Sequence, residues 1–445
     1  MTVSSVLQGI CSSLLRLYPL RLEATAKSTI AAFSFQFING SFPDKLRSPQ
    51  IKKEGNMISN RTKEMTPFIV MDVLERAHEM ERQGIHVIHL EVGEPDFDTP
   101  RCIKDAACKA LDDGHTHYTH SLGMIGLREA ISEHYFENYS VSVDPDQIVI
   151  SSGTSPAMFV MFSTLLEKGD QVIISDPHYA CYPNFIKFVQ GEPVTIPVYE
   201  EDGFQYRPEA IQEKITNRTK AIFINSPSNP TGNLLSESRM KAIADLQQEP
   251  GSPYIISDEI YHGLVYEGKE HSILEFTDKA FIFNGFSKLY AMTGLRLGYM
   301  IAPKDFIRPI QKVQQNFFIS ANAMVQVAGI AALKQAGEDI ANMKRTYNER
   351  RQYIIRRLKD MGFGITVEPT GAFYVFANAK HISTDSYKLA FDILEKARVG
   401  VAPGIDFGEN GEGYLRFSYA TSMENIAEGM DRLEKYIEQY DHKIR

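Results

Sequence analysis

The stretch Asn284–Gly298 reads NGFSKLYAMTGLRLG, and the interpretation of the whole chain starts from it. It follows Ala280–Phe283 (AFIF), an apolar run short enough for a buried β-strand. Lys288 therefore follows a predicted buried strand, where loss of water lowers the lysine pKa and makes the free amine a nucleophile toward a carbonyl. A single lysine in such a place more often extends to the surface, so this hypothesis depends on the motifs around it.

Length and composition indicate a globular protein of two domains or one large one. The chain has 445 residues, of which 43% are hydrophobic and 23% charged. A net charge of -9 and the lack of a long Lys/Arg run argue against nucleic acid or an anionic membrane as the main partner. The four cysteines (Cys11, Cys102, Cys108 and Cys181) show no CxxC spacing. They predict reduced thiols in a cytoplasmic protein, and no metal site is expected.

Residues 1–56 are expected to form a leader that adds nothing to the fold and is disordered or marginally helical. The segment Val6–Leu20 is interrupted by polar residues and is too short to span a bilayer. No positive charge precedes it, as a secretory signal would require. The Ser, Arg and Leu content is also compatible with an organellar transit peptide. Met57 opens a stretch that resembles a natural protein start.

Short apolar strands alternate with helices through the middle of the chain. The predicted strands are Gln147–Ser151, Gln171–Ile174, Pro193–Val198, Ala221–Ile224, Tyr254–Ile256 and Ala280–Phe283. This alternation predicts an α/β fold with a mostly parallel sheet covered by helices on both faces, and ligands in such sheets bind at the carboxyl ends of the strands.

A change of pattern near the C-terminus predicts a second, smaller α+β domain. After a mainly helical segment at 305–361, the strands appear antiparallel and mix with helices. We expect residues 103–333 to form the large domain. Residues 57–102 and 334–445 are then expected to form the two parts of the small domain.

Several candidate functional residues follow predicted strands. Ser152–Ala157 is a turn of small residues between a strand and a helix, a layout that can hold a phosphate on backbone amides and the helix dipole. Alone it is a weak signal, and it lacks the lysine of a nucleotide-binding loop. Asp258 and Tyr261 follow Tyr254–Ile256. Taken singly, Asp258 could be a helix cap and Tyr261 a core tyrosine.

Together these residues suit one cofactor, pyridoxal phosphate. Lys288 would bond to its aldehyde carbon. Asp258 would pair with the pyridine nitrogen and keep it protonated, which lets the ring accept electrons from the substrate's α-carbon. The phosphate would be held by Gly153, Thr154, Ser155 and Arg296.

Six stretches in one order give the chain a family resemblance. They are GEPDF (Gly93–Phe97), NPTG (Asn229–Gly232), SDEIY (Ser257–Tyr261), Ser287–Arg296, GAFY (Gly371–Tyr374) and YLRFS (Tyr414–Ser418). With them the chain resembles the class I/II pyridoxal-phosphate-dependent aminotransferases, the aspartate aminotransferase superfamily of fold type I. The resemblance covers nearly all of the chain beyond the leader.

The resemblance implies a role for each matching residue. Lys288 would also move the proton between the substrate's α-carbon and the cofactor. Tyr261 and Asn229 would hydrogen-bond the cofactor's phenolic oxygen, and Tyr179 would stack on the ring. Arg416 would clamp the substrate's α-carboxylate, a task that suits a planar guanidinium.

Three further residues follow from the same resemblance. Gly93 would offer its backbone to the substrate carboxylate. Ser287 would be the hydroxyl near the phosphate, since Gly285 stands where many relatives have serine. Tyr118 is similar to a tyrosine that reaches the neighbouring subunit's phosphate, which implies a homodimer.

The implied reaction is ping-pong transfer of an amino group from an α-amino acid to a 2-oxo acid, with 2-oxoglutarate the expected acceptor. Aspartate, alanine and aromatic amino acids stay open as donors, and Ser155, where some relatives carry lysine, argues against aspartate. One alternative is a β-eliminating C–S lyase that uses the same cofactor. The other is a non-catalytic sensor, which should carry a DNA-binding module that residues 1–56 do not resemble.

Overall fold

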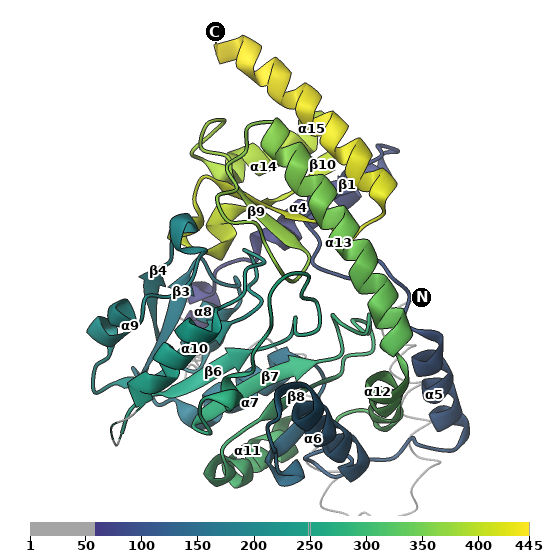
Figure 1. Ribbon diagram of the computed structural model, residues 1–445, viewed down its shortest axis with the longest axis vertical. Coiled ribbons are helices and arrows are strands. Elements are labelled where there is room, and N and C mark those ends of the chain that lie inside the picture. The colour runs from purple at the N-terminus through teal and green to yellow at the C-terminus, as the bar shows by residue number, and fades with distance from the viewer. Residues whose placement is uncertain (1–57, 248, 250, 445) are drawn as a thin grey trace, which may run out of the picture. The chain divides into compact units, whose positions relative to one another are not determined.

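The computed structural model describes residues 58–247, 249 and 251–444, with side chains up to residue 439 (Figure 1). The predicted leader, residues 1–56, lies outside the described residues. The compact unit described below is Asn60–Arg445. None of its described helices is both long and apolar enough to cross a membrane.

A seven-stranded sheet forms the centre of this unit, in the order β2-β8-β7-β6-β5-β3-β4. Its strands are β2 (Ile148–Ser151), β3 (Gln171–Asp176), β4 (Glu192–Pro197), β5 (Thr219–Asn225), β6 (Tyr254–Asp258), β7 (Ala280–Gly285) and β8 (Gly298–Ile301). Neighbours from β4 to β7 pair in parallel, whereas β8 runs antiparallel to both β7 and β2. The predicted α/β fold with a mostly parallel sheet is confirmed.

Both faces of the sheet are buried because alternate residues of each strand enter two different cores. On β5, Ile222 and Ile224 belong to one core, and Ala221 and Phe223 belong to the other. This explains why the strands are continuous apolar runs. The first core is covered by α5 (Arg101–Asp112), α6 (Ile125–Tyr139), α9 (Pro208–Lys214), α10 (Glu237–Ala244) and α12 (Ala323–Gln335). The second is covered by α7 (Thr154–Leu165), α8 (Tyr182–Phe188) and α11 (Lys304–Phe317).

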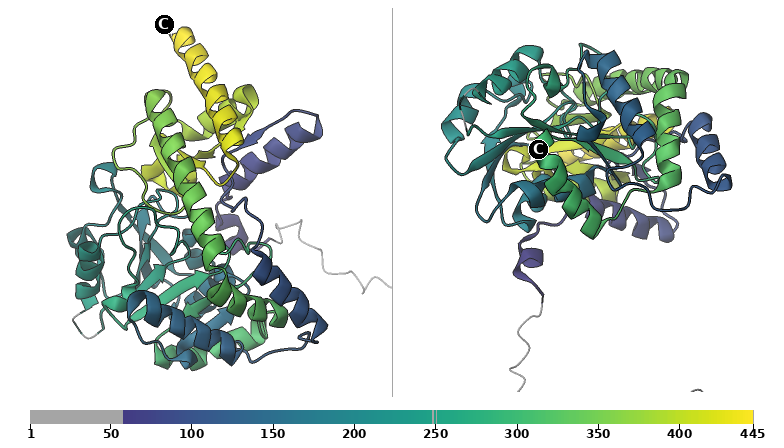
Figure 2. Two further views of the ribbon diagram at one scale, coloured as in Figure 1. Left: turned by 45° about the vertical axis from the view of Figure 1, so that its right-hand side comes forward. Right: turned by 90° about the horizontal axis from the view of Figure 1, so that it is seen from below.

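The C-terminal part of the chain forms a third core around a smaller antiparallel sheet. Its strands, in the order β11-β12-β9, are β11 (Ala402–Pro403), β12 (Tyr414–Ser418) and β9 (Tyr374–Asn378). The helices are α13 (Gly337–Asp360), α14 (Ser386–Ala397) and α15 (Met423–Ile444). Figures 1 and 2 show α13 as a long helix that connects the region of the large sheet to this third core.

The segment before the large sheet joins this C-terminal region. After the short α3 (Asn60–Glu64), α4 (Ile69–Arg82) packs against α14, and β1 (Ile88–His89) pairs in parallel with β10 (Val399–Gly400). A small domain made of two separate parts of the chain requires contacts such as this pairing between them. The predicted domain boundaries stay predictions.

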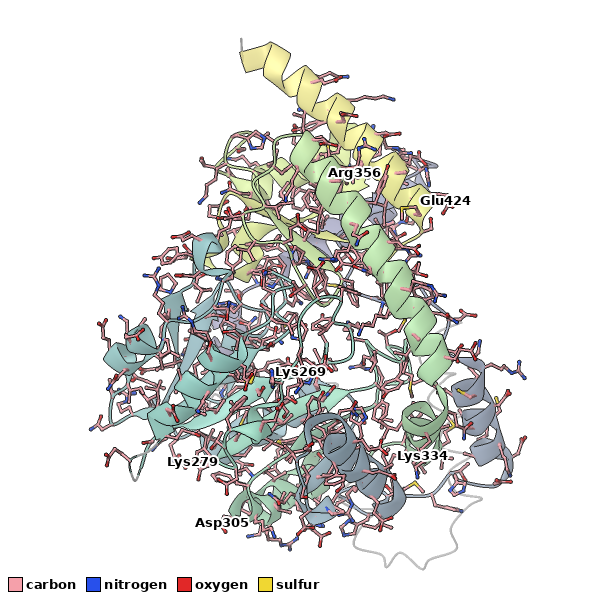
Figure 3. The ribbon with its side chains drawn as sticks, viewed as in Figure 1. Lys269, Lys279, Asp305, Lys334, Arg356 and Glu424 are labelled. Carbon is pink, nitrogen blue, oxygen red and sulfur yellow. The ribbon has the colours of Figure 1, made fainter. Side chains whose placement is uncertain are left out.

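Three elements differ from the sequence-based expectations. The alternation of Ile88, Leu90 and Val92 with polar residues predicts a strand over residues 88–92. The strand is only Ile88–His89, because the backbone carbonyl of Leu90 already accepts a hydrogen bond from the Ser418 amide and the chain then turns. The helical segment at 305–361 is divided into α11, α12 and α13, with Ile319 at a φ of +63° in the first break. Helix α8 was not predicted. Charged side chains such as Arg356 and Glu424 lie on the outer faces of α13 and α15 (Figure 3).

Candidate active site

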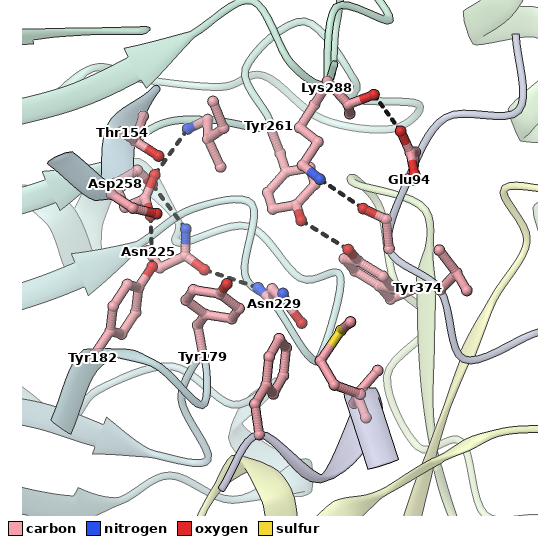
Figure 4. Close-up of a pocket in the computed structure, with 18 of the residues that line it drawn as sticks. Glu94, Thr154, Tyr179, Tyr182, Asn225, Asn229, Asp258, Tyr261, Lys288 and Tyr374 are labelled. Carbon is pink, nitrogen blue, oxygen red and sulfur yellow. Dashed lines mark hydrogen bonds between the residues drawn. The ribbon is translucent and has the colours of Figure 1, made fainter. Parts of the chain in front are cut away.

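A cavity of about 460 Å³ lies at the carboxyl ends of the central strands (Figure 4). Strand β5 contributes Asn225, β6 contributes Asp258, and the turn after β7 contributes Lys288. Arg416 on β12 and Tyr374 on β9 line it from the small antiparallel sheet. The cavity is therefore built where the sequence predicted ligands to bind, and its volume suits a small molecule.

The Lys288 amine projects into this cavity. Its Nζ donates a hydrogen bond to the Gly93 carbonyl oxygen at 2.6 Å and lies 5.8 Å from the centre of the Phe373 ring. Burial among these groups lowers the pKa of Lys288 to about 8. A large fraction of the amine is therefore neutral near pH 8, as a nucleophile toward a carbonyl requires.

Asp258 ends β6 and is 4% exposed. Its Oδ2 accepts a hydrogen bond from the Tyr182 hydroxyl at 2.7 Å, and its Oδ1 accepts one from the Ile260 amide at 3.2 Å. Burial raises the pKa of Asp258 to about 6, and the bond from Tyr182 opposes that rise. The carboxylate is thus fixed in place and would be stabilised by a cationic group brought into the cavity.

Tyr182 was missed in the sequence, although it lies three residues after Tyr179. Both side chains line the cavity, with ring centres 5.2 Å apart in an edge-to-face arrangement. Tyr179 also packs edge-to-face on Phe68 at 6.0 Å. Tyr179 is therefore oriented by two aromatic neighbours.

Arg416 is held by aromatic faces and by two oxygen atoms. Its guanidinium lies 4.4 Å from the Tyr374 ring centre. It donates to Asn229 Oδ1 at 2.9 Å and to the Glu91 carbonyl at 2.5 Å. Its Nε is buried without a protein partner. Because a buried donor without a partner is unfavourable, this N–H is available to an anionic ligand.

Two tyrosine hydroxyls meet beside Lys288. Tyr261 and Tyr374 are both buried, and their oxygens are 2.8 Å apart. A Cβ on Gly93 would lie 2.3 Å from the Tyr374 hydroxyl, so the backbone of Gly93 approaches this pair as only glycine can. Tyr374 lies in the GAFY stretch, but no role in the site was predicted for it.

A cradle for an anion forms at the N-terminus of α7. Gly153 has a φ of +97°, and a Cβ there would lie 2.6 Å from Arg296 Nη2. Thr154, Ser155 and Arg296 line the cavity, and Arg296 Nη1 is oriented by the Thr293 carbonyl at 2.9 Å. Free backbone amides, the helix dipole and a guanidinium together favour a phosphate.

Three predicted residues, Gly153, Ser287 and Tyr118, are not among the residues that line this cavity, although Gly153 contacts Arg296, which does line it. Ser287 is adjacent to Lys288 in the turn but is absent from the lining, and Tyr118 is 80% exposed. The exposure of Tyr118 is compatible with a contact to another subunit. All three roles stay predictions.

The donor set fits pyridoxal phosphate. The cavity combines a lysine amine, a buried carboxylate, an anion cradle and an aromatic ring from different elements. Arg416 lies in the same cavity with an unpartnered N–H for a carboxylate. A phosphorylated aldehyde with a basic ring nitrogen can use all of these groups at once.

Comparisons with known proteins identify the family of the chain. Residues 85–433 match the family model of class I and II aminotransferases. The chain is 43% identical over 385 residues to a (5-formylfuran-3-yl)methyl phosphate transaminase of Methanocaldococcus jannaschii, covering 86% of this chain and 100% of that protein. It is also 43% identical over 374 residues to an aspartate aminotransferase of Pyrococcus horikoshii, covering 83% of this chain and 94% of that protein.

A solved structure gives the same result for the fold. The aspartate aminotransferase of Thermus thermophilus with maleate superimposes with a TM-score of 0.81 at 36% identity, covering 85% of this chain and 99% of the other. This confirms fold type I. The chain belongs to the class I and II aminotransferases, a family of pyridoxal-phosphate-dependent enzymes.

Proposed function

We propose that this aminotransferase takes its amino group from α-amino acids with apolar or aromatic side chains and passes it to a 2-oxo acid such as 2-oxoglutarate. The observation that carries the proposal is that Lys288, Asp258 and Arg416 face one cavity whose remaining wall is mostly apolar. The two half-reactions would use this cavity in turn, as a ping-pong mechanism requires.

Each residue would have a separate task. Bound pyridoxal phosphate supplies a ring that accepts electrons from the substrate's α-carbon. Asp258, fixed by Tyr182, would keep the proton on the ring nitrogen. The Lys288 amine, with its pKa near 8, would take a proton from the α-carbon and return one to the cofactor.

The ends of the ligands would be held by arginines. Arg416 would orient the α-carboxylate, with Asn229 Oδ1 fixing the guanidinium. Arg296 and the N-terminus of α7 would hold the phosphate. Tyr261 and Asn229 would hydrogen-bond the phenolic oxygen, and Tyr179 would stack on the ring.

The donor preference follows from the start of α4. Phe68, Val70, Met71 and Leu74 bring apolar side chains to the cavity. The cations of the described lining are Lys288, Arg296 and Arg416, and each has a task already. A distal carboxylate would therefore meet apolar groups without a cation of this chain to offset its desolvation.

We also propose that the chain acts as a homodimer in which Tyr118 reaches the partner's phosphate. Its 80% exposure supports this, as does the exposure of Phe317 (66%) and Ile319 (47%) in the segment around the break after α11. A cytoplasmic location is proposed as well, and the described cysteines, Cys102, Cys108 and Cys181, are free thiols.

A panel of amino acids tests the donor preference. Each is assayed with 2-oxoglutarate and, separately, with pyruvate, because donor and acceptor share the cavity. Phenylalanine, tyrosine, leucine or methionine should give a higher kcat/KM than aspartate. A preference for aspartate by tenfold or more would contradict the proposal. Release of pyruvate and ammonia from cystathionine without an acceptor would instead support the C–S lyase. The sensor alternative is set aside, because the chain belongs to an aminotransferase family and the relatives it matches at 43% identity are named as transaminases.

A further inference from the structure

Two histidines and a glutamate meet where the last turn of α4 passes β1. His78 and Glu81 are exposed and lie on one face of α4, three residues apart, and His89 is the half-buried second residue of β1. One ligand atom from each lies within 4.8 Å of the other two. His89 Nε2 is 3.1 Å from Glu81 Oε1, and the two imidazole ring centres are 5.8 Å apart.

A buried carboxylate orients the central histidine. Glu91 is 0% exposed, and its Oε1 accepts a hydrogen bond from His89 Nδ1 at 2.7 Å. Its Oε2 is buried without a partner, against Gly400, where a Cβ would lie 2.2 Å away. His89 Nδ1 donates to Glu91 and Nε2 faces Glu81 at 3.1 Å, so a metal cation that replaces the proton on Nε2 would lie between His89 and Glu81. A carboxylate behind a ligating histidine is the usual outer support of a metal site.

We propose that His78, Glu81 and His89 bind a divalent first-row transition cation, with Zn²⁺ as the ion to test. Two imidazoles and one carboxylate, with water in the fourth position, form an established ligand set for this ion. Ligand atoms at about 2.0–2.1 Å from a tetrahedral ion are roughly 3.4 Å apart. The His89–Glu81 pair already has nearly this spacing, and the exposed His78 can rotate to complete it.

The site would clamp two segments that border the active-site cavity. The first turns of α4 supply Val70 and Met71 to the cavity wall. Two residues after His89, the Glu91 carbonyl accepts the hydrogen bond from Arg416. None of the three proposed ligands lines the cavity, so the ion would stabilise the fold without taking part in amino transfer. This differs from the sequence analysis, in which no metal site was expected.

Zinc binding to the holoenzyme tests the proposal. The chelator-treated protein is titrated with ZnCl₂ by calorimetry, and thermal unfolding is followed with and without Zn²⁺. One ion per chain should bind and raise Tm. His78→Ala and Glu81→Gln should each weaken binding by about 100-fold or more, beyond the 10–100-fold typical of outer partners. His115→Ala, which removes another exposed histidine, should bind like the wild type.

A second readout does not depend on the variants' stability. Co²⁺ added to the wild-type holoenzyme should give the visible bands of a four-coordinate site at wavelengths beyond the cofactor's absorption, and Zn²⁺ should displace them. His89→Ala is avoided, because it would leave Glu91 buried without a partner. Equal zinc affinity in the wild type, His78→Ala and Glu81→Gln, or no binding at millimolar Zn²⁺, would overturn the proposal.

Discussion

Lys288 and Asp258 titrate outside their ordinary ranges for the same reason, since both are enclosed by protein. Burial lowers the pKa of the Lys288 amine to about 8 and raises the pKa of the Asp258 carboxyl to about 6. Each shift favours the uncharged form of its side chain. The cofactor would bring a partner for each group. Its aldehyde would react with the uncharged amine of Lys288, and its basic ring nitrogen, once protonated, would stabilise the charged carboxylate of Asp258.

The shift at Lys288 predicts how the stability of the apoenzyme depends on pH. The folded pKa of about 8 lies below the ordinary 10.5, so between these values the unfolded chain binds more protons than the folded one. The free energy of unfolding should therefore rise as pH increases from 8 to 10.5. Below pH 8 the folded protein bears the full cost of burying a charged amine. In urea unfolding, the free energy of unfolding of the wild type relative to Lys288→Met should increase by roughly 2 kcal/mol between pH 8 and pH 10.5. A difference that does not change with pH would contradict an enclosed amine.

Tyr182→Phe tests the support of Asp258. The change removes the hydroxyl that donates to Asp258 Oδ2 at 2.7 Å while keeping the ring that packs on Tyr179. Hydrogen bonds to charged groups contribute about 1.5–3 kcal/mol, so the Kd of the apoenzyme for pyridoxal phosphate should rise by roughly tenfold or more. Fluorescence titration measures it. Tyr206→Phe, which removes a buried hydroxyl bonded to the Phe223 carbonyl, serves as control and should leave this Kd unchanged.

At the scale of elements, α7 and the segment that carries Arg296 can approach each other closely because both contact positions, Gly153 and Gly298, are glycines. Gly153 has a positive φ and meets Arg296 Nη2, while a Cβ on Gly298 would lie 2.8 Å from the Gly153 backbone. The helix N-terminus and the guanidinium can therefore converge on one anion.

Gly153→Ala should displace Arg296 and lower the affinity for pyridoxal phosphate at least fivefold, in addition to destabilising the fold by about 1–3 kcal/mol for the strained φ. Gly114→Ala is the matched control. Gly114 also has a positive φ, of +84°, but nothing lies within 4 Å of a Cβ there. It should show the loss of stability alone. Equal cofactor affinity in the two variants would show that the close approach at Gly153 is unimportant.

The sequence predicted the elements that carry local signals and missed those set by packing. The apolar strands and the turns after them were evident, so the motif residues of the cavity could be named in advance. The antiparallel direction of β8 could not, because Gly298–Ile301 has the same apolar pattern as a parallel strand. Tyr182 and Tyr374 were missed for a similar reason, since a tyrosine's hydroxyl partner is visible only in the fold.

The wall of the cavity at the start of α4 was also beyond sequence reasoning. Phe68, Met71 and Leu74 lie far along the chain from Asp258 and Lys288, and helical periodicity does not direct them to a ligand cavity. They reach the cavity because α4 packs with the C-terminal elements, through contacts with α14 and β11. The proposed substrate preference would therefore depend on how α4 packs against the C-terminal elements.

For the whole molecule, Tyr118 links the proposed assembly to the proposed site. If its hydroxyl reaches a partner's phosphate, Tyr118→Phe should raise the Kd for pyridoxal phosphate by about tenfold and leave the dimer intact by light scattering. Phe136→Leu, a change at another exposed ring (61%), is the control and should alter neither the Kd for pyridoxal phosphate nor the dimer. A monomeric wild-type protein that retains full activity would remove the basis for this role.

The most direct measurement concerns the atom that bonds to the cofactor. The holoenzyme is reduced with borohydride, digested, and analysed by mass spectrometry for the peptide that carries the pyridoxyl group. We expect the label on Lys288 alone, with loss of both the label and transaminase turnover in Lys288→Ala. A label on another lysine, or full turnover in the variant, would contradict the account.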